Sequence, residues 1–214
     1  HLVRNEDYWG IDENGNRLPY LYEITIRVIR DQTVLASALR TGEIDIAYLP
    51  YKDVAAFQRD ERFQIDIMPG GNIAAVLVFN VTKAPLDDVN LRLAIAHAID
   101  PVVINKAIFF NRVTVADSGM WPEGAWAHDP DVERPTYDPE QALVYLARAG
   151  RPDGFEFTAV TINSPTLIPT AEIVRVMLKK VGITMNIEVL NVTSATERFF
   201  HGRAYPMYLS GWSR

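Results

Sequence analysis

The sequence predicts an α/β fold, and three observations support that prediction. Strand-like and helix-like hydrophobic periods alternate along most of the chain. Residues 155–192 read as strand, helix and strand in succession, which is the unit that forms a parallel strand pair through a right-handed crossover. The 214 residues are 48% apolar and 22% charged, an ordinary globular balance with enough chain for one large or two small cores.

The first third of the chain is predicted to be mostly strands, with two short helices. Alternating or continuous apolar residues predict strands over 22–30, 42–50, 63–68 and 73–80, with a turn at 69–71. The last of these, IAAVLVFN, is apolar nearly throughout, which is typical of a central strand covered on both faces. Asp31 stands where it caps a helix that ends at Gly42, and a second helix is predicted over 52–58.

After residue 80 the pattern becomes helical. Residues 84–109 predict two helices that are separated at Asp100-Pro101, and residues 137–150 predict a third, which Asp138 caps and Gly150 ends. Between them lies a long irregular stretch, 111–136, in which we expect Trp121 and Trp126 to act as anchors. The remaining predictions are strands over 155–162, 183–192 and 205–214, and helices over 171–181 and 193–201. The change of period places a lobe boundary between residues 82 and 83.

Composition and charge exclude several classes of protein. The net charge is −6 and the 21 basic residues are scattered singly, which argues against a nucleic-acid groove. The absence of cysteine excludes disulfides, thiol catalysis and Cys-ligated zinc. No apolar run approaches the roughly 18 residues of a membrane helix. The first residues show neither a methionine nor a signal pattern, so we expect an internal or processed N-terminus.

Eight stretches of the sequence, in order and over nearly the whole chain, carry a resemblance to a known family. The chain resembles the extracytoplasmic solute-binding proteins of peptide-type ABC importers, family 5, which include oligopeptide, dipeptide, nickel and glutathione receptors. The stretches are VRNEDYWG (3–10), LPYLYEITIRVIRD (18–31), ALRTGEIDIAYLP (38–50), VLVFN (76–80), APLDDVNLRLAIAHAID (84–100), YDPEQALVYLARAG (137–150), LKKVGI (178–183) and YLSGW (208–212).

The resemblance implies a two-lobed fold of the type II periplasmic binding protein class, similar to dipeptide-binding proteins. Such a receptor is a periplasmic or extracytoplasmic monomer that binds a peptide or another small solute between its lobes and delivers it to membrane permease subunits. It implies no catalytic step, no cofactor and no nucleic acid. Family members are longer, so the chain is expected to be incomplete at both ends, with 1–82 the late part of lobe I and 83–214 the early part of lobe II.

The resemblance also implies where the solute binds. In peptide-binding members the backbone at Gly211 to Ser213 takes the ligand as an extra strand, and Trp212 would be a wall of that pocket. We expect a cleft where the lobes meet, near Asn80 and Trp212. From the residues alone, each of these two has another possible role. Trp212 can be an aromatic packed on a core, and Asn80 can be an amide that satisfies the backbone of a turn. The predicted ligand-binding residues are Asn80, Asn163, Tyr208, Gly211, Trp212 and Ser213.

Two departures from the family leave the solute open. Dipeptide receptors carry an arginine in the loop after the strand 155–162, whereas here that loop, Asn163 to Pro169, contains no cation. Oligopeptide receptors tend to have an arginine two residues before the glycine of the GW pair, where this chain has Leu209. A longer peptide, a sugar or another solute therefore remains possible.

Two other classes of function compete with this interpretation. A hydrolase-like α/β enzyme would have His97, Asp87 and Asp88 as candidates, but a lone helical histidine is usually packed and the aspartates precede a helix that they can cap. A stand-alone interaction domain would show a closed core. HDPDVE, residues 128–133, is the one cluster similar to a metal ligand set, and because it lacks calcium-loop spacing we expect a solvated loop and no metal there.

Overall fold

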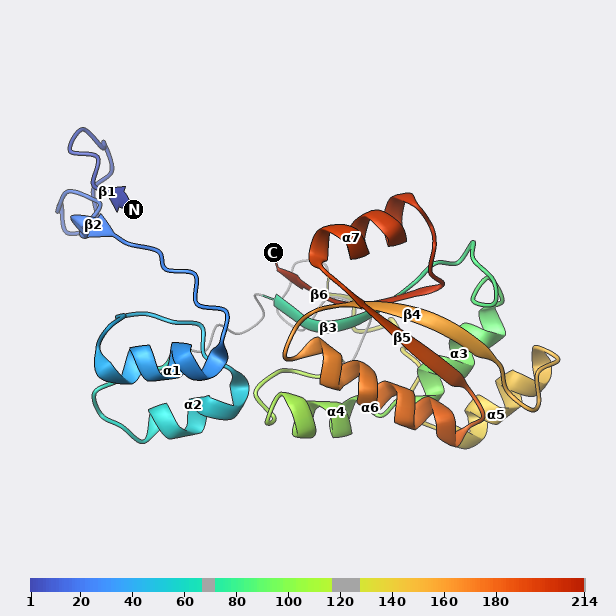
Figure 1. Cartoon of the computed structure of the whole chain (residues 1–214). Coiled ribbons are helices and arrows are strands. Elements are labelled where there is room, and N and C mark those ends of the chain that lie inside the picture. Colours follow the sequence, from blue (N-terminus) through green and yellow to red (C-terminus); the bar gives the residue numbers. More distant parts are fainter. Residues whose placement is uncertain (67–71, 117–127, 214) are drawn as a thin grey trace. The chain divides into compact units, whose positions relative to one another are not determined.

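The structure, a computed structural model, describes residues 1–66, 72–116 and 128–213. Contacts between residues divide the chain into two compact units, His1–Asp53 and Val54–Arg214 (Figure 1). A compact unit of this chain need not coincide with a lobe of a longer protein, so the boundary between 82 and 83 remains a prediction.

The unit His1–Asp53 contains a small strand pair and one helix. Strand β1 (Leu2–Val3) pairs with β2 (Glu23–Ile24) in the antiparallel sense. Helix α1 (Gln32–Thr41) begins where Asp31 accepts hydrogen bonds from the backbone nitrogens of Thr33 and Val34, at 2.8 and 3.0 Å. It ends at Gly42, whose φ of 73° lies in the left-handed region. Both helix signals are therefore confirmed. Helix α2 (Tyr51–Gln58) follows and confirms the second helix.

Most of the strand predictions in this region are wrong. Only Glu23–Ile24 of the predicted strand 22–30 is a strand, and residues 42–50 contain none. Ile26, Val28, Ile46 and Tyr48 have the alternation of strand residues but are 70–94% exposed. A strand needs a neighbour for its backbone hydrogen bonds, and no strand in the described part of the chain pairs with residues 25–30 or 42–50. Residues 63–66 form no strand either, and 67–71 lie outside the described residues.

A four-stranded mixed sheet is the centre of the unit Val54–Arg214 (Figure 1). Its order is β3-β6-β4-β5, in which β4 is parallel to both neighbours and β3 is antiparallel to β6. The strands are β3 (Asn72–Phe79), β4 (Glu156–Ile162), β5 (Thr184–Leu190) and β6 (Met207–Ser213). The predicted strand 73–80 thus exists, but it lies at an edge of this sheet and its residues from Ala74 to Phe79 are half-buried rather than covered.

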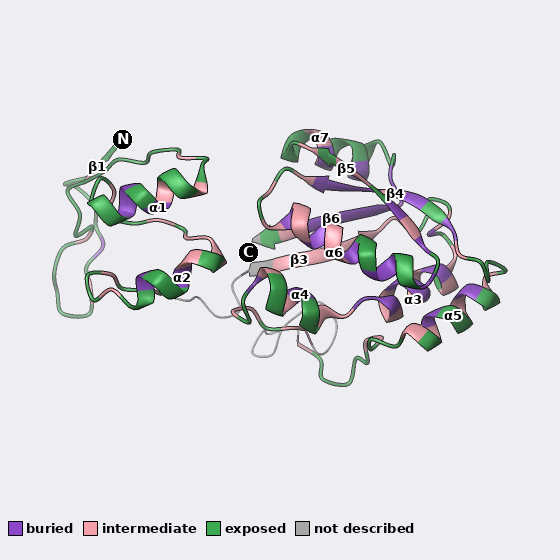
Figure 2. Cartoon of the chain, turned by 60° about the horizontal axis from the view of Figure 1, so that its bottom comes forward, coloured by how far each residue is buried: buried purple, intermediate pink, exposed green. Residues whose placement is uncertain are grey.

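Helices cover the two faces of the sheet. Helix α6 (Leu167–Lys180) connects β4 to β5 on one face, which confirms the predicted strand-helix-strand unit. On the other face, α7 (Val192–Thr196) continues into the π-helix η1 (Glu197–His201) and leads to β6 (Figure 1). Buried positions concentrate in β4 and β6 (Figure 2). The core between β4, β6 and α7 with η1 consists of Val160, Ala195, Phe199, Tyr205 and Tyr208.

Three further helices lie beyond α6. They are α3 (Val89–Ala98), α4 (Pro101–Ile108) and α5 (Pro139–Arg148). Asp88, Asp100 and Asp138 each accept hydrogen bonds from backbone nitrogens of the helix that follows, so the predicted caps are confirmed. The predicted anchors Trp121 and Trp126 lie outside the described residues. Among the helices that the structure describes, none has both the length and the apolar character needed to cross a bilayer.

Candidate functional site

The candidate site is the end of the sheet at which β4, β5 and β6 finish. The chain leaves β4 toward α6 on one face and leaves β5 toward α7 on the other. Where neighbouring parallel strands connect to opposite faces, the loops part and leave a crevice in which ligands of open α/β sheets bind. Asn163 follows β4 there, and its backbone nitrogen donates to the carbonyl oxygen of Leu190 at 2.8 Å.

β6 extends beyond its parallel partner at this end. The ladder between β4 and β6 finishes at the pair Thr161 and Leu209, where the Thr161 hydroxyl donates to the Leu209 carbonyl oxygen at 2.9 Å. β6 continues to Ser213 and is paired with β3 on its other side. On the side of Gly211 to Ser213 that faces β4, no strand within residues 1–66, 72–116 or 128–213 takes up the backbone groups. This three-residue segment, Gly211 to Ser213, is called the open edge below.

Four of the six predicted ligand-binding residues lie at this end of the sheet. Asn163 is exposed, and Trp212 is 37% exposed within the open edge. Tyr208 belongs to the same strand, but its side chain is only 3% exposed and packs with its ring 5.3 Å from that of Phe199. For Tyr208 the structure therefore shows a core aromatic. The ligand-binding role of the other residues remains a prediction.

Asn80 lies at the opposite end of the sheet, against the expectation of one cleft shared with Trp212. Because β3 is antiparallel to β6, the end of β3 lies beside the start of β6, and the Asn80 nitrogen donates to the Pro206 carbonyl oxygen at 2.8 Å. Trp212 stands six positions after Pro206, which is about 20 Å at the usual rise of a strand. The Asn80 side-chain oxygen accepts from the nitrogen and the hydroxyl of Thr82, at 3.1 and 2.8 Å. Asn80 thus satisfies a turn.

An ionic cluster holds the start of β6. Arg198 of η1 donates to a Glu188 carboxylate oxygen at 2.7 Å, and its guanidinium carbon lies 4.9 Å from the ring centre of Tyr205. The hydroxyl of Tyr205, followed by Arg198, lowers the pKa of Glu188. Burial, followed by the Glu188 carboxylate, raises the pKa of Tyr205 to about 12. That hydroxyl is close enough for this coupling, yet it is buried without a hydrogen bond of standard geometry.

The residues considered for catalysis have structural contacts. The Nδ1 atom of His97 lies 2.7 Å from the Thr136 carbonyl oxygen, to which a protonated Nδ1 donates, and the ring stacks on Tyr145. Asp88 caps α3, and the backbone oxygen of Asp87 accepts from Arg92 at 3.0 Å. His97 therefore ties the last turn of α3 to the segment before α5, whereas Asp87 and Asp88 stand before the first residue of that helix.

The cluster at 128–133 forms a turn in which Asp129 accepts from the backbone nitrogen of Asp131 at 3.0 Å. Within the described ranges, no group of three or more histidine, aspartate or glutamate side chains is arranged to hold a metal ion.

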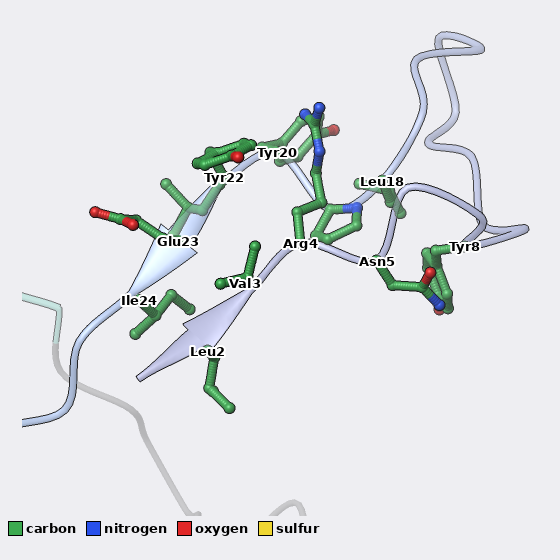
Figure 3. A pocket seen from close by; sticks show the side chains of 12 residues that line it. Leu2, Val3, Arg4, Asn5, Tyr8, Leu18, Tyr20, Tyr22, Glu23 and Ile24 are labelled. Atoms are coloured by element: carbon green, nitrogen blue, oxygen red, sulfur yellow. The ribbon is translucent and has the colours of Figure 1, made fainter.

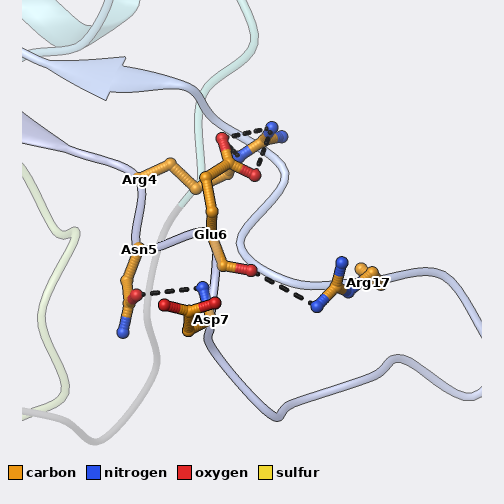
Figure 4. Close-up of polar contacts among 5 residues, drawn as sticks. All are labelled: Arg4, Asn5, Glu6, Asp7 and Arg17. Atoms are coloured by element: carbon orange, nitrogen blue, oxygen red, sulfur yellow. Dashed lines mark hydrogen bonds and ion pairs between the residues drawn. The ribbon is translucent and has the colours of Figure 1, made fainter.

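A second feature, in the unit His1–Asp53, is an apolar hollow of about 580 Å³ around β1 and β2 (Figure 3). Its lining includes Leu2 and Tyr22, which are still 56% and 63% exposed, so it is an open face and not an enclosed pocket. Beside it, the Glu6 carboxylate accepts from Arg4 at 2.8 Å and the Glu6 backbone oxygen from Arg17 at 3.3 Å (Figure 4). This hollow was not predicted, although the tyrosines at 8, 20 and 22 that line it are a signal in the sequence.

Sequence reasoning also missed the reason why the open edge exists, which is a difference in length between β4 and β6. The one local signal is Gly211, because a glycine inside a strand often marks a place where another backbone approaches.

Comparisons with known proteins agree with the fold and the resemblance. A family model for the middle part of bacterial extracellular solute-binding proteins, family 5, matches residues 1–214. Heme-binding protein A of Haemophilus influenzae is 30% identical over 86% of this chain and 33% of its own length. The dipeptide-binding protein of Escherichia coli is 28% identical over 97% of this chain and 38% of its own.

Among solved structures, the periplasmic binding protein DppA of Helicobacter pylori, in complex with the peptide STSA, superposes with a TM-score of 0.84 and 28% identity. The match covers 99% of this chain and 40% of that protein, which confirms the predicted fold class. The chain spans 33–42% of the length of the curated relatives that it matches. Together, the match along the whole chain and this structural likeness show that the chain belongs to the bacterial extracellular solute-binding proteins, family 5.

Proposed function

We propose that the protein that contains this chain is the substrate-binding component of an ABC importer. It captures a peptide or a similar small solute between two lobes and delivers it to membrane permease subunits. The family supports this proposal, as does the likeness to a periplasmic binding protein of an ABC transporter that was solved with a bound peptide. The relatives are named as binding proteins, which supports a role without catalysis, and the H. pylori protein is named as periplasmic, which supports a place outside the cytoplasm. That the receptor acts as a monomer is part of the proposal.

The open edge is the observation that supports a peptide most directly. A peptide can add to an unpaired strand edge through main-chain hydrogen bonds, which do not depend on its side chains. Gly211 to Ser213 offers such an edge, and Trp212 stands there partly exposed as an apolar surface for a ligand side chain. The relatives are named for heme, dipeptides and glutathione, and of these only the peptides present the backbone that an open strand edge selects.

The proposal is tested by adding the tetrapeptide Ser-Thr-Ser-Ala, the ligand of the H. pylori structure, to the full-length protein. A ligand that binds only the folded state raises the melting temperature by mass action. At a ligand concentration of 100 times Kd, the free energy of unfolding increases by about 2.7 kcal/mol. Trp212→Ala should weaken binding about tenfold, as expected when a central aromatic contact is truncated. Tyr137→Ala, which removes a 44% exposed aromatic before α5, is the matched control and should bind normally.

A second version of the experiment tests the main-chain contact itself. Peptides N-methylated at one amide at a time should lose about 1 kcal/mol, roughly fivefold in Kd, wherever the amide donates to the open edge. Because successive amides of a strand point to opposite sides, the weakening should alternate along the peptide. A protein that binds neither Ser-Thr-Ser-Ala nor any other peptide, while sugars or heme raise its melting temperature, would rule out a peptide receptor.

A further inference from the structure

Two buried hydroxyl groups lie beside the open edge. Apart from tyrosines, the buried polar side chains of the described residues are Thr161, Thr170 and Ser210, which are 1%, 2% and 4% exposed. A buried hydroxyl is costly unless it is hydrogen-bonded. Thr170 donates to the Thr166 carbonyl oxygen at 2.7 Å, at the start of its own helix, α6. The other two hydroxyls donate to backbone carbonyl oxygens of β6.

The backbone groups of β6 alternate between its two neighbouring strands. The carbonyl oxygen of Pro206 accepts from the nitrogen of Asn80 on the β3 side, so every second residue of β6 after Pro206 also faces β3. The backbone groups of Leu209 and Gly211 therefore face β4. Leu209 belongs to the last pair of the parallel ladder, and no residue of β4 pairs with Gly211. In the described part of the chain, the open edge thus begins with the backbone of Gly211.

The two hydroxyls hold these two carbonyl groups from opposite faces of the sheet. Thr161 donates to the Leu209 carbonyl oxygen at 2.9 Å, and Ser210 donates to the Gly211 carbonyl oxygen at 3.2 Å. The residue before Thr161 and the residue two before Ser210 both belong to the core beside α7 and η1. Because side chains alternate along a strand, Ser210 points to the face of α7, and Thr161 points to the face of α6.

The ladder on the other side of β6 is irregular at the same point. The pairing of β3 with β6 shifts register between Ile73 and Val76, opposite the span from Ser210 to Trp212. Such an irregularity disrupts the ladder locally. Gly211 lies within this span, and glycine has more conformational freedom than any other residue. The contacts of the two hydroxyls are therefore what restrains the backbone where the open edge begins.

We propose that Thr161 and Ser210 are positioning residues for the ligand. Their hydroxyls hold the carbonyl groups of Leu209 and Gly211, so that the open edge already has strand geometry when a peptide pairs with it. The inference rests on the proposed function and adds the residues that prepare its site. A carbonyl oxygen has two acceptor positions, so Gly211 can keep the Ser210 hydroxyl and also accept a ligand amide. Pre-organisation raises affinity because less conformational freedom is lost on binding.

Thr161→Val in the full-length protein tests the shorter of the two contacts, because it removes the hydroxyl and keeps the branched shape. Kd for Ser-Thr-Ser-Ala should rise about fivefold, and Thr161→Ser, which keeps a hydroxyl, should restore most of the affinity. Ser210→Ala should weaken binding in the same direction. Thr170→Val is the matched control, since it removes an equally buried hydroxyl that contacts only α6, and it should keep Kd within about twofold. Equal weakening by Thr161→Val and Thr170→Val would overturn the proposal.

Peptides N-methylated at single amides separate positioning from a general loss of stability. In the unmodified protein and in Thr170→Val, methylation of the amide that donates to Gly211 should raise Kd about fivefold. In Thr161→Val the same methylation should raise Kd less than about twofold, because the contact is already poorly formed. The same fivefold penalty in all three proteins would contradict the positioning role.

Hydrogen exchange without ligand distinguishes failure of this inference from failure of the proposed function. Backbone amides of residues 207–213 should exchange faster in Thr161→Val than in Thr170→Val or the unmodified protein. If the unmodified protein does not bind the peptide, the proposed function is wrong and the hydroxyls position no ligand. If it binds and Thr161→Val changes neither Kd nor exchange, the positioning role is wrong while the receptor function stands.

Discussion

Among the residues that the structure describes, few buried side chains carry a charge or a hydroxyl, and Tyr205 is one of them. The residue is 4% exposed, the guanidinium of Arg198 covers its ring, and its hydroxyl is buried near the Glu188 carboxylate without a hydrogen bond of standard geometry. A buried hydroxyl without a partner costs about 1–3 kcal/mol. The buried ring of Tyr205 therefore stabilises the fold, and the buried hydroxyl offsets part of that stabilisation.

We expect Tyr205 to make the protein less stable as the pH rises into the alkaline range. Its pKa is raised from 10.0 to about 12, chiefly by burial and then by the Glu188 carboxylate, so the unfolded chain releases the proton first. The contribution is complete below pH 10 and is lost as the pH rises from 10 to about 12. Urea unfolding at neutral pH and across this interval, for the native protein and Tyr205→Phe, checks the expectation.

The variant should unfold with an equal or larger free energy at neutral pH, because it deletes the unpaired oxygen, and it should lose less stability in the alkaline interval. Parallel losses in both proteins would contradict the assignment.

At the scale of elements, the turns that connect helices to strands restrict most strongly which residues can be accommodated. Gly154, between α5 and β4, has a φ of 90°, and a Cβ atom there would lie 2.0 Å from the carbonyl oxygen of Gly182, which follows α6. The two turns therefore touch through their backbones. This contact sets how close the start of β4 lies to the end of α6.

Gly154→Ala should destabilise the protein by more than Gly42→Ala does. Both glycines have positive φ, which costs an alanine about 1–2 kcal/mol, but a Cβ at Gly42 meets nothing within 4 Å. At Gly154 the overlap with Gly182 adds about 1–3 kcal/mol, because the backbone itself must move. Thermal unfolding of the two variants makes the comparison, and equal shifts in Tm would show that the close approach costs nothing.

The elements also show what the sequence could and could not predict. Helices α1, α4 and α5 were predictable because an aspartate cap and a proline or glycine signal are local in sequence. Strand pairing is not local, so the alternation at 22–30 and 42–50 predicted two strands, of which only Glu23–Ile24 finds a partner among the described residues. The cleft expected from the resemblance had Asn80 near Trp212, whereas the antiparallel register of β3 and β6 separates them.

At the scale of the whole molecule, the two units differ in how much core they contain. In the unit His1–Asp53 the buried apolar side chains are Ala36, Ala38 and Leu39, all on α1. The unit Val54–Arg214 holds the large, fully buried side chains, among them Leu178, Ile183 and Met207. Local stability follows the number of buried apolar contacts, so the units should open with very different free energies.

Hydrogen exchange of the 214-residue chain should therefore separate the two units. Backbone amides of residues 1–30 should exchange fast, because few of them are buried or paired, and those of β4 and β6 should exchange slowest. Mass spectrometry after pepsin digestion measures the difference. Equal protection in residues 1–30 and in β4 would show that the first unit is as stable as the second.

The unequal lengths of β4 and β6 have a consequence for how receptors of this kind diverge. If peptides bind through their main chain at Gly211 to Ser213, that contact does not depend on their amino-acid sequence. Ligand specificity is then determined by the loops around the strand ends, whose residues can vary without disturbing the sheet. Substitutions at a few loop positions can thus change which solute such a receptor binds without affecting how it folds.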